Sequence, residues 1–195
     1  MPAATRARAL RIKPALMMQL LRYEVLGKVR FDAAFRDYIR AWAFKHPTPA
    51  DFFRTIENVS GADLSWFWNS FFYGTDVLDI ALDGITMRQV NGQSQAEIHL
   101  RRVTSIPFPV TIRLKLNGGS TQDVSLPVDI WARTDRYTAI VPVSRAVIGA
   151  RLWPDSHVPD FNRANDTWGD VPLADVTTSS AGGIAPPVPP SPTRP

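Results

Sequence analysis

The chain has 195 residues, of which 45% are hydrophobic and 21% charged, a composition typical of a globular protein of one or two domains with a real core. It contains no cysteine, which excludes disulfides, a thiolate nucleophile and a cysteine-based metal site. The formal net charge of +4 is mildly basic and does not by itself indicate nucleic acid, and no apolar run approaches the roughly 20 residues that span a bilayer.

The first thirteen residues are basic and contain no acidic side chain. A secretory signal would need an uninterrupted apolar stretch followed by a small-residue cleavage site, and Lys13 and Pro14 interrupt the pattern here. A phosphate-binding arm would be expected to interleave aromatic and basic residues, and this segment has no aromatic residue. We therefore expect neither a nucleic-acid partner nor a membrane partner, and the compartment stays unknown.

Two helices are predicted next. Pro14 suits the first turn of a helix that ends at Gly27, and its apolar residues fall on both faces, which predicts deep burial. The second helix runs from about Arg30 to Phe44, because apolar residues recur at Phe31, Phe35, Tyr38, Ile39 and Trp42. It ends before His46, because the residue that precedes a proline is disfavoured in a helix.

Two shorter helices follow between residues 44 and 73. Thr48 can cap the first, with Pro49 at the first helical position and Asp51 three residues after the cap. Asp63 sits at the start of the second, where a carboxylate is favoured by the helix dipole. A wide apolar stripe follows it, consisting of Leu64, Phe67, Trp68, Phe71 and Phe72. On this pattern alone the interpretation is a packed helical core.

The periodicity changes to two after Gly74, which indicates strands with one buried and one wet face. Residues 110–117 alternate in this way and end at a hairpin turn, Asn117–Gly119. Further strands are expected near residues 84–90, 98–101, 122–131, 136–142 and 147–153. We predict an α+β fold: a helical part at 1–78, an antiparallel β-sandwich at 79–170 joined to it near residues 74–83, and a disordered Pro-rich tail at 171–195. Pro189 to Pro192 of that tail could instead dock to an aromatic groove.

Residues 12–170 carry several short motifs in a fixed order: Lys13-Pro14, Leu26-Gly27, Thr48-x-x-Asp51-Phe52, and Gly61-Ala62-Asp63-Leu64-Ser65-Trp66-Phe67. Together they resemble the end of the catalytic domain of zinc aminopeptidases of the aminopeptidase N type, which are gluzincin metallopeptidases of family M1. The resemblance implies a helical end of a thermolysin-like catalytic domain followed by a β-sandwich. It also implies a parent hydrolase that removes N-terminal residues from peptide substrates with zinc-activated water.

The resemblance does not bring the family's catalytic groups with it. The family binds zinc through His-Glu-x-x-His on one helix, where two histidines four residues apart face one metal. This chain has only His46, His99 and His157, which are far apart in the sequence. The family's oxyanion-stabilising tyrosine falls at Arg11, and an arginine does not reproduce a phenol. We therefore expect a C-terminal fragment with no catalytic, metal or cofactor-binding residue of its own, and so no cofactor.

A calcium site is the alternative that the C-terminal segment suggests, because it contains an oxygen-rich cluster of Asp155, Asp160, Asn162, Asn165 and Asp166. A calcium loop that began at Asp160 would want glycine at its sixth position and glutamate at its twelfth, and the chain has Asn165 and Val171 there. Asx side chains that cap their own turns are the better interpretation of this cluster.

Three functions stay open from the sequence. The first is the inactive C-terminal portion of an aminopeptidase-like protein, the second a non-catalytic protein-interaction module, and the third a nucleic-acid binder, which ranks last. Seven aromatic residues are more than we expect four short helices to bury among themselves: Phe35, Trp42, Phe53, Trp66, Phe67, Trp68 and Phe71. We expect an uncovered apolar patch there, which a missing N-terminal part or self-association would cover.

Overall fold

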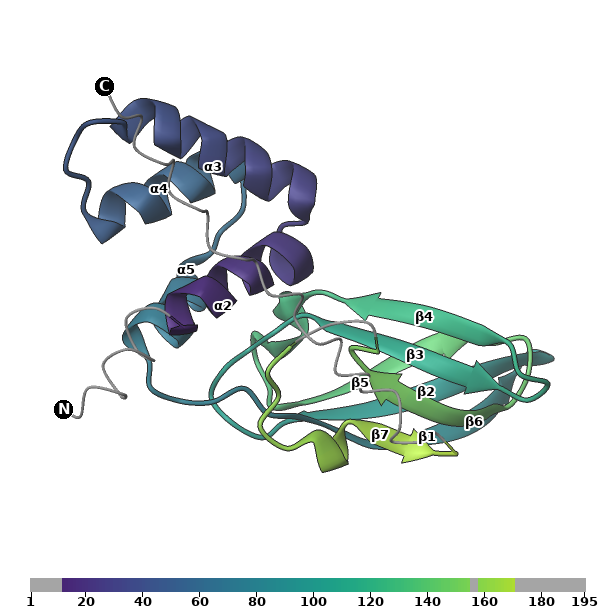
Figure 1. Ribbon diagram of the computed structural model, residues 1–195. Helices are drawn as coiled ribbons and strands as arrows, with labels where there is room; N and C mark the ends of the chain where they lie inside the picture. The colour runs from purple at the N-terminus through teal and green to yellow at the C-terminus, as the bar shows by residue number, and fades with distance from the viewer. Residues whose placement is uncertain (1–11, 155–157, 171–195) are drawn as a thin grey trace, which may run out of the picture.

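The computed structural model describes residues 12–154 and 158–170. Its α-helices all precede its strands in the chain, and this separation of helices and strands agrees with the predicted α+β class (Figure 1). The basic arm with Arg11, the pair Asp155 and His157, and the predicted Pro-rich tail lie outside the described residues. None of the described helices is long and apolar enough to cross a membrane.

The helical part contains the predicted helices with two π-helical turns that sequence reasoning did not foresee. Its elements are α2 (Lys13–Leu20), η2 (Leu21–Val25), α3 (Lys28–Trp42), α4 (Pro49–Ser60), α5 (Ser65–Trp68) and η3 (Asn69–Tyr73). Both π turns directly continue an α-helix, so the first and last of the four predicted helices each run on without a break into a wider π-helical turn. Helix α3 ends two residues earlier than predicted, at Trp42.

All strand pairs are antiparallel, as predicted, and they form two open sheets. The strands are β1 (Ile80–Val90), β2 (Gln93–Arg102), β3 (Val110–Leu116), β4 (Thr121–Leu126), β5 (Arg136–Pro142), β6 (Val147–Leu152) and β7 (Thr167–Gly169). One sheet has the order β1-β2-β5 and the other the order β4-β3-β6-β7. The predicted strand over 122–131 is wrong in its second half, where Pro127 lacks the N–H that a ladder needs and a 3-10 turn, η4 (Val128–Trp131), follows.

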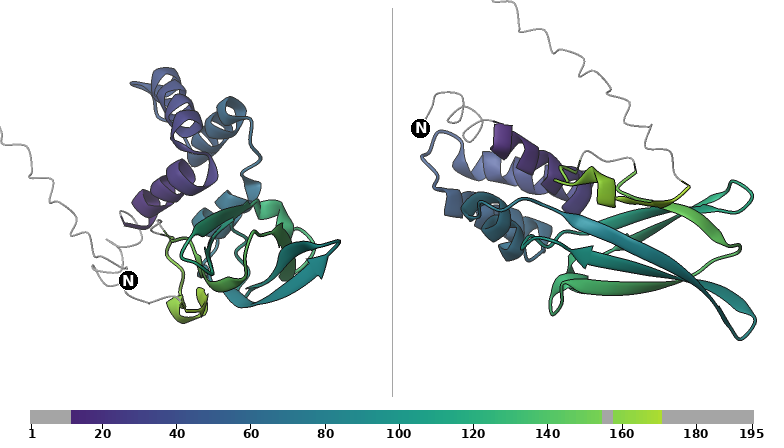
Figure 2. Two further views of the ribbon diagram at one scale, coloured as in Figure 1. Left: turned by 90° about the vertical axis from the view of Figure 1, so that its right-hand side faces the viewer. Right: turned by 90° about the horizontal axis from the view of Figure 1, so that it is seen from below.

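The two sheets lie face to face (Figures 1 and 2). Along β3 the buried positions are Val110, Ile112, Leu114 and Leu116, which is the alternation that the sequence predicted. The junction between helices and strands is shorter than the predicted 74–83, because Leu78 is already buried and β1 begins at Ile80.

One continuous apolar core joins the helices to the sheets. Phe108, in the segment between β2 and β3, is completely buried, and its ring centroid lies 6.2 Å from that of Trp66, 6.1 Å from that of Phe71 and 6.3 Å from that of Trp153. A residue of the β part therefore covers aromatic rings of the helical part, and the division at residue 78 remains a prediction rather than an observed boundary.

The expectation of uncovered aromatic residues is wrong for four of the seven. Phe53, Phe67, Trp68 and Phe71 are buried, and Trp42 and Trp66 are partly buried. Rings stack on one another more completely than their number suggested: the Phe53 and Trp68 centroids are 4.4 Å apart with the planes nearly parallel. Of these seven residues only Phe35, at 39% exposure, is exposed.

Candidate functional site

The motif residues of the helical part occupy the ends of helices. Asp51 accepts hydrogen bonds from the Thr48 backbone N (2.8 Å) and from Thr48 Oγ1 (2.6 Å), which forms the predicted capping box at the start of α4. Gly61 follows α4 at a φ of 64°, a left-handed conformation that glycine adopts without a Cβ clash. Asp63 lies just before the N-cap of α5, which is Leu64, and accepts from the backbone N (2.9 Å) and Oγ (2.6 Å) of Ser65, the first residue of the helix.

The charges of the Asp51 and Asp63 carboxylates also favour their positions at the starts of helices. Hydrogen bonds from Thr48 hold the pKa of Asp51 below its ordinary value, and hydrogen bonds from Ser65 do the same for Asp63. Both carboxylates are thus anionic at the positive ends of helices. Their chemistry is that of helix caps, and neither is poised to accept a proton from a substrate.

Two further contacts fix how the helices meet. Lys13 Nζ donates to the carbonyl oxygen of Gly74 (3.1 Å), so the first motif residue ties α2 to the end of η3. Glu57 Oε1 accepts from the backbone N of Leu64 and from Trp68 Nε1, both at 3.1 Å, which fixes the turn between α4 and α5. Sequence reasoning did not single out Glu57, because its partners lie seven and eleven residues away.

The loop between α3 and α4 presents the most exposed aromatic side chain among the described residues. Phe44 is fully exposed, at 106% of its reference area, and has a φ of 60°. Sequence reasoning placed Phe44 at the end of a helix and gave it no role. Its residue type carries no signal of exposure, since a phenylalanine after a helix is usually buried.

The two histidines that the structure describes, His46 and His99, lie in different parts of the fold. His46 lies exposed in the α3–α4 loop, whereas His99 lies on β2, where its ring nitrogens contact Thr86 Oγ1 (3.2 Å) and Thr138 Oγ1 (3.1 Å). In the described part of the chain no three His, Cys, Asp or Glu side chains are grouped so as to hold a metal ion. These residues do not fit the zinc centre that the resemblance implies, and we derive no chemical step through zinc.

The oxygen-rich cluster of the C-terminal segment makes hydrogen bonds to residues at the start of β1. Asp160 Oδ2 accepts from the backbone N of Ile80 (3.0 Å), and Asn165 Nδ2 donates to Asp79 Oδ1 (2.9 Å). The predicted Asx turns are present at two positions: Asp160 Oδ1 accepts from the N of Asn162, and Asn162 Oδ1 accepts from the N of Ala164. Asp79 was missed because it lies 86 residues from its partner.

Asp166 is the described member of this cluster whose buried carboxylate has the fewest hydrogen-bond partners. The residue is 2% exposed, Oδ2 accepts from Arg163 Nη1 (3.2 Å), and Oδ1 has no hydrogen-bond partner. Burial, reinforced by the nearby Asp160 carboxylate, raises the pKa of Asp166 to about 6. Burial likewise raises the pKa of Asp160. The segment 158–169 is therefore held in place at the expense of an unfavourable buried charge.

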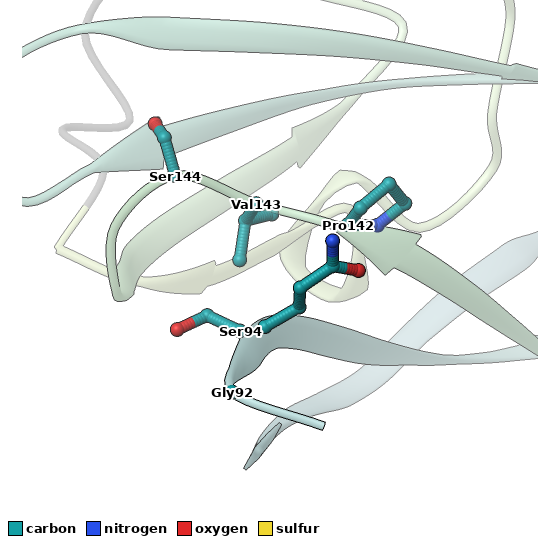
Figure 3. Close-up of a pocket in the computed structure, with 6 residues that line it drawn as sticks. Gly92, Ser94, Pro142, Val143 and Ser144 are labelled. Carbon is teal, nitrogen blue, oxygen red and sulfur yellow. The ribbon is translucent and has the colours of Figure 1, made fainter. Parts of the chain in front are cut away.

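A surface depression of about 440 Å³ lies at the end of the β1–β2 hairpin, against the turn that follows β5 (Figure 3). Its lining consists of Gly92, Gln93, Ser94, Pro142, Val143 and Ser144. These residues include no acid, base or cation, so the depression contains no group that could transfer a proton or hold a metal. We assign no chemistry to it.

Comparisons with known proteins give little more. No family model matches the sequence, and no curated protein matches it. Among solved structures, the fold is similar to the crystal structure of Legionella pneumophila aminopeptidase A in complex with aspartic acid, at a TM-score of 0.49 and 18% identity. The likeness covers 70% of this chain, and the chain spans 15% of that protein. These comparisons assign the chain to no family.

Proposed function

We propose that this chain is the helical end and β part of a zinc-aminopeptidase-like protein and that it serves there as a non-catalytic structural portion. The observation that carries the proposal is the role of the motif residues. Thr48 with Asp51, Gly61, and Asp63 each perform a specific capping task, in the chain order that the sequence resemblance gives them. The order and spacing of these helix ends along the chain, rather than any one capping residue, support the proposal, because Thr, Asp and Gly are common at helix ends.

In this proposal the chain has a structural role in the parent protein and supplies no catalytic group. Among the described residues, the carboxylates of the motif are engaged as caps and the two histidines lie in different parts of the fold. Hydrolysis of the parent kind needs an activated water and an oxyanion stabiliser, which other residues would have to supply. The chain alone is therefore expected to hydrolyse no peptide.

The first experiment measures the metal content of the purified chain and its hydrolysis of amino-acyl anilides. We expect no stoichiometric zinc and no hydrolysis above the buffer rate. About one tightly bound zinc per chain, together with hydrolysis that a chelator abolishes, would overturn the non-catalytic assignment.

The second experiment tests the parentage. The DNA upstream of the Met1 codon is read for a frame that encodes His-Glu-x-x-His, and the product of such a frame is co-expressed with this chain. We expect the two polypeptides to co-purify and to bind zinc together. If no such frame exists, or if its product neither binds nor activates the chain, the aminopeptidase parentage is rejected and the interaction-module function takes its place.

A further inference from the structure

The helical part ends in a protruding tip. The tip consists of residues 39–50, which are the last turn of α3, the connecting loop and the first turn of α4. It lies at the end of the helical part that points away from both sheets (Figures 1 and 2). Nothing in the described fold packs over it, and most of its side chains are exposed.

Phe44 stands at the centre of this tip in a conformation that opposes its residue type. It follows the C-cap of α3, at a φ of 60°, where glycine or asparagine is the usual residue because a Cβ is disfavoured. The helix end needs only its backbone there: the N of Ala43 donates to the carbonyl oxygen of Ile39, and the N of Lys45 to that of Trp42. The phenyl ring itself is fully exposed. The ring thus adds nothing to the isolated fold and suits a surface that buries it elsewhere.

The tip is basic. Residues 39–50 contain Arg40 and Lys45 and no acidic residue, and the nearest acidic residues in the sequence are Asp37 and Asp51 on either side of the tip. Asp37 lies 3.4 Å from Arg40, and the Asp51 carboxylate is bound by Thr48. The outward charge of the tip is therefore positive.

Two more side chains of the tip complete a pattern typical of membrane interfaces. Ile39 is 51% exposed on the last turn of α3. The Nζ of Lys45 lies 5.9 Å from the centroid of the partly buried Trp42 ring, which places an indole next to a cation. Aromatic and aliphatic residues with a basic rim are the residues that enter the boundary between lipid headgroups and acyl chains.

We propose that this tip docks on an anionic lipid surface, with Phe44 inserted among the lipids and the basic side chains on the headgroups. A protruding tip with an apolar centre can enter a lipid surface without a matching pocket, and its positive charge favours anionic lipid. This proposal goes beyond the structural portion proposed above. It also departs from the expectation of no membrane partner, which rested on the lack of a spanning segment and does not bear on peripheral binding.

The full chain is tested by co-sedimentation with vesicles of phosphatidylcholine alone and of phosphatidylcholine mixed with phosphatidylglycerol. We expect binding to the anionic vesicles only, weakening as salt is raised. Phe44→Ala should lower the vesicle partition coefficient about tenfold or more, since full burial of a phenyl ring is worth at least that factor. Phe161→Ala is the matched control, because Phe161 is 73% exposed on the β part and should have no effect.

A second set of variants guards against misfolding and reports insertion directly. Phe44→Gly relieves the left-handed backbone, so it should remain folded and still lose binding. Because the chain has no cysteine, Phe44→Cys and Phe161→Cys can each carry one environment-sensitive dye. Only the dye at position 44 should shift to the blue on anionic vesicles.

Four results would overturn the proposal: no vesicle binding, equal binding to neutral vesicles, binding unchanged by Phe44→Gly, or equal dye shifts at both positions. A concentration-dependent self-association of the wild-type chain that Phe44→Gly abolishes, without vesicle binding, would show instead that the tip joins two copies of the chain.

Discussion

Replacing Phe108 by alanine tests whether the helices and the sheets share one core. The phenyl ring is completely buried and contacts aromatic rings from η3 and α5 on one side and Trp153 on the other. A Phe-to-Ala change in such a position removes the transfer free energy of the ring and leaves a cavity, which together lower the free energy of unfolding by about 3–5 kcal/mol. That is a large part of the roughly 5–15 kcal/mol by which a domain is stable.

The assay is urea unfolding followed both by tryptophan fluorescence and by circular dichroism. The chain has six tryptophans, and Trp66, Trp68, Trp131 and Trp153 report from both parts of the fold. With an m-value of about 2 kcal/mol/M, the variant's midpoint should fall by roughly 2 M. Because the core is continuous, the two probes should still give coincident transitions. Phe161→Ala, on the surface, should shift the midpoint by far less.

A loss below about 1 kcal/mol would refute this reasoning, since a fully buried ring cannot be removed so cheaply. So would two separate transitions of which Phe108→Ala moves only one. That outcome would favour the predicted boundary at residue 78 and two independently folding domains.

Three smaller perturbations test single features. Thr48→Ala removes one half of the capping box and should lower the free energy of unfolding by about 1 kcal/mol in the same urea assay. The pKa of Asp166 is raised in the folded state, so its contribution to stability is full below pH 4 and is lost as the pH rises through about 6. Relative to Asp166→Asn, the free energy of unfolding of the wild type should fall by about 1–3 kcal/mol between pH 4 and pH 7.5. A difference that does not depend on pH would contradict this. Phe44→Gly should raise the melting temperature in a calorimetric scan, because no buried surface is lost and the disfavoured φ is relieved by about 1 kcal/mol; a lower melting temperature would show that the ring packs.

The features that could be predicted from the sequence are those whose partners are close in the chain. Thr48 and Asp51 are three residues apart, and Asp63 and Ser65 two, so their capping bonds follow from local spacing. The alternation along β3 likewise needs no knowledge of its partner strands.

The features that could not be predicted depend on pairs distant in the chain. Asn165 reaches Asp79 across 86 residues, and Asp160 reaches Ile80 across 80. No local spacing distinguishes these from the Asx turns that the same segment also contains. The π-helical turns at η2 and η3 were missed for a different reason, because the apolar pattern of a helix is nearly the same whether its last turn is wide or narrow.

The motifs are likewise short and local, so they indicate where helices begin and end more firmly than they indicate an activity. Their carboxylates accept hydrogen bonds at the starts of helices, and many unrelated helices have a residue in this role. Phe44 is the converse case, since its residue type and its backbone conformation conflict within one residue. Such a conflict is informative because folding alone does not favour it: a glycine would end α3 better and would expose no apolar side chain to water. The residue that the isolated fold explains least is therefore the one whose surroundings, an exposed apolar centre with a basic rim, most directly indicate what the chain touches.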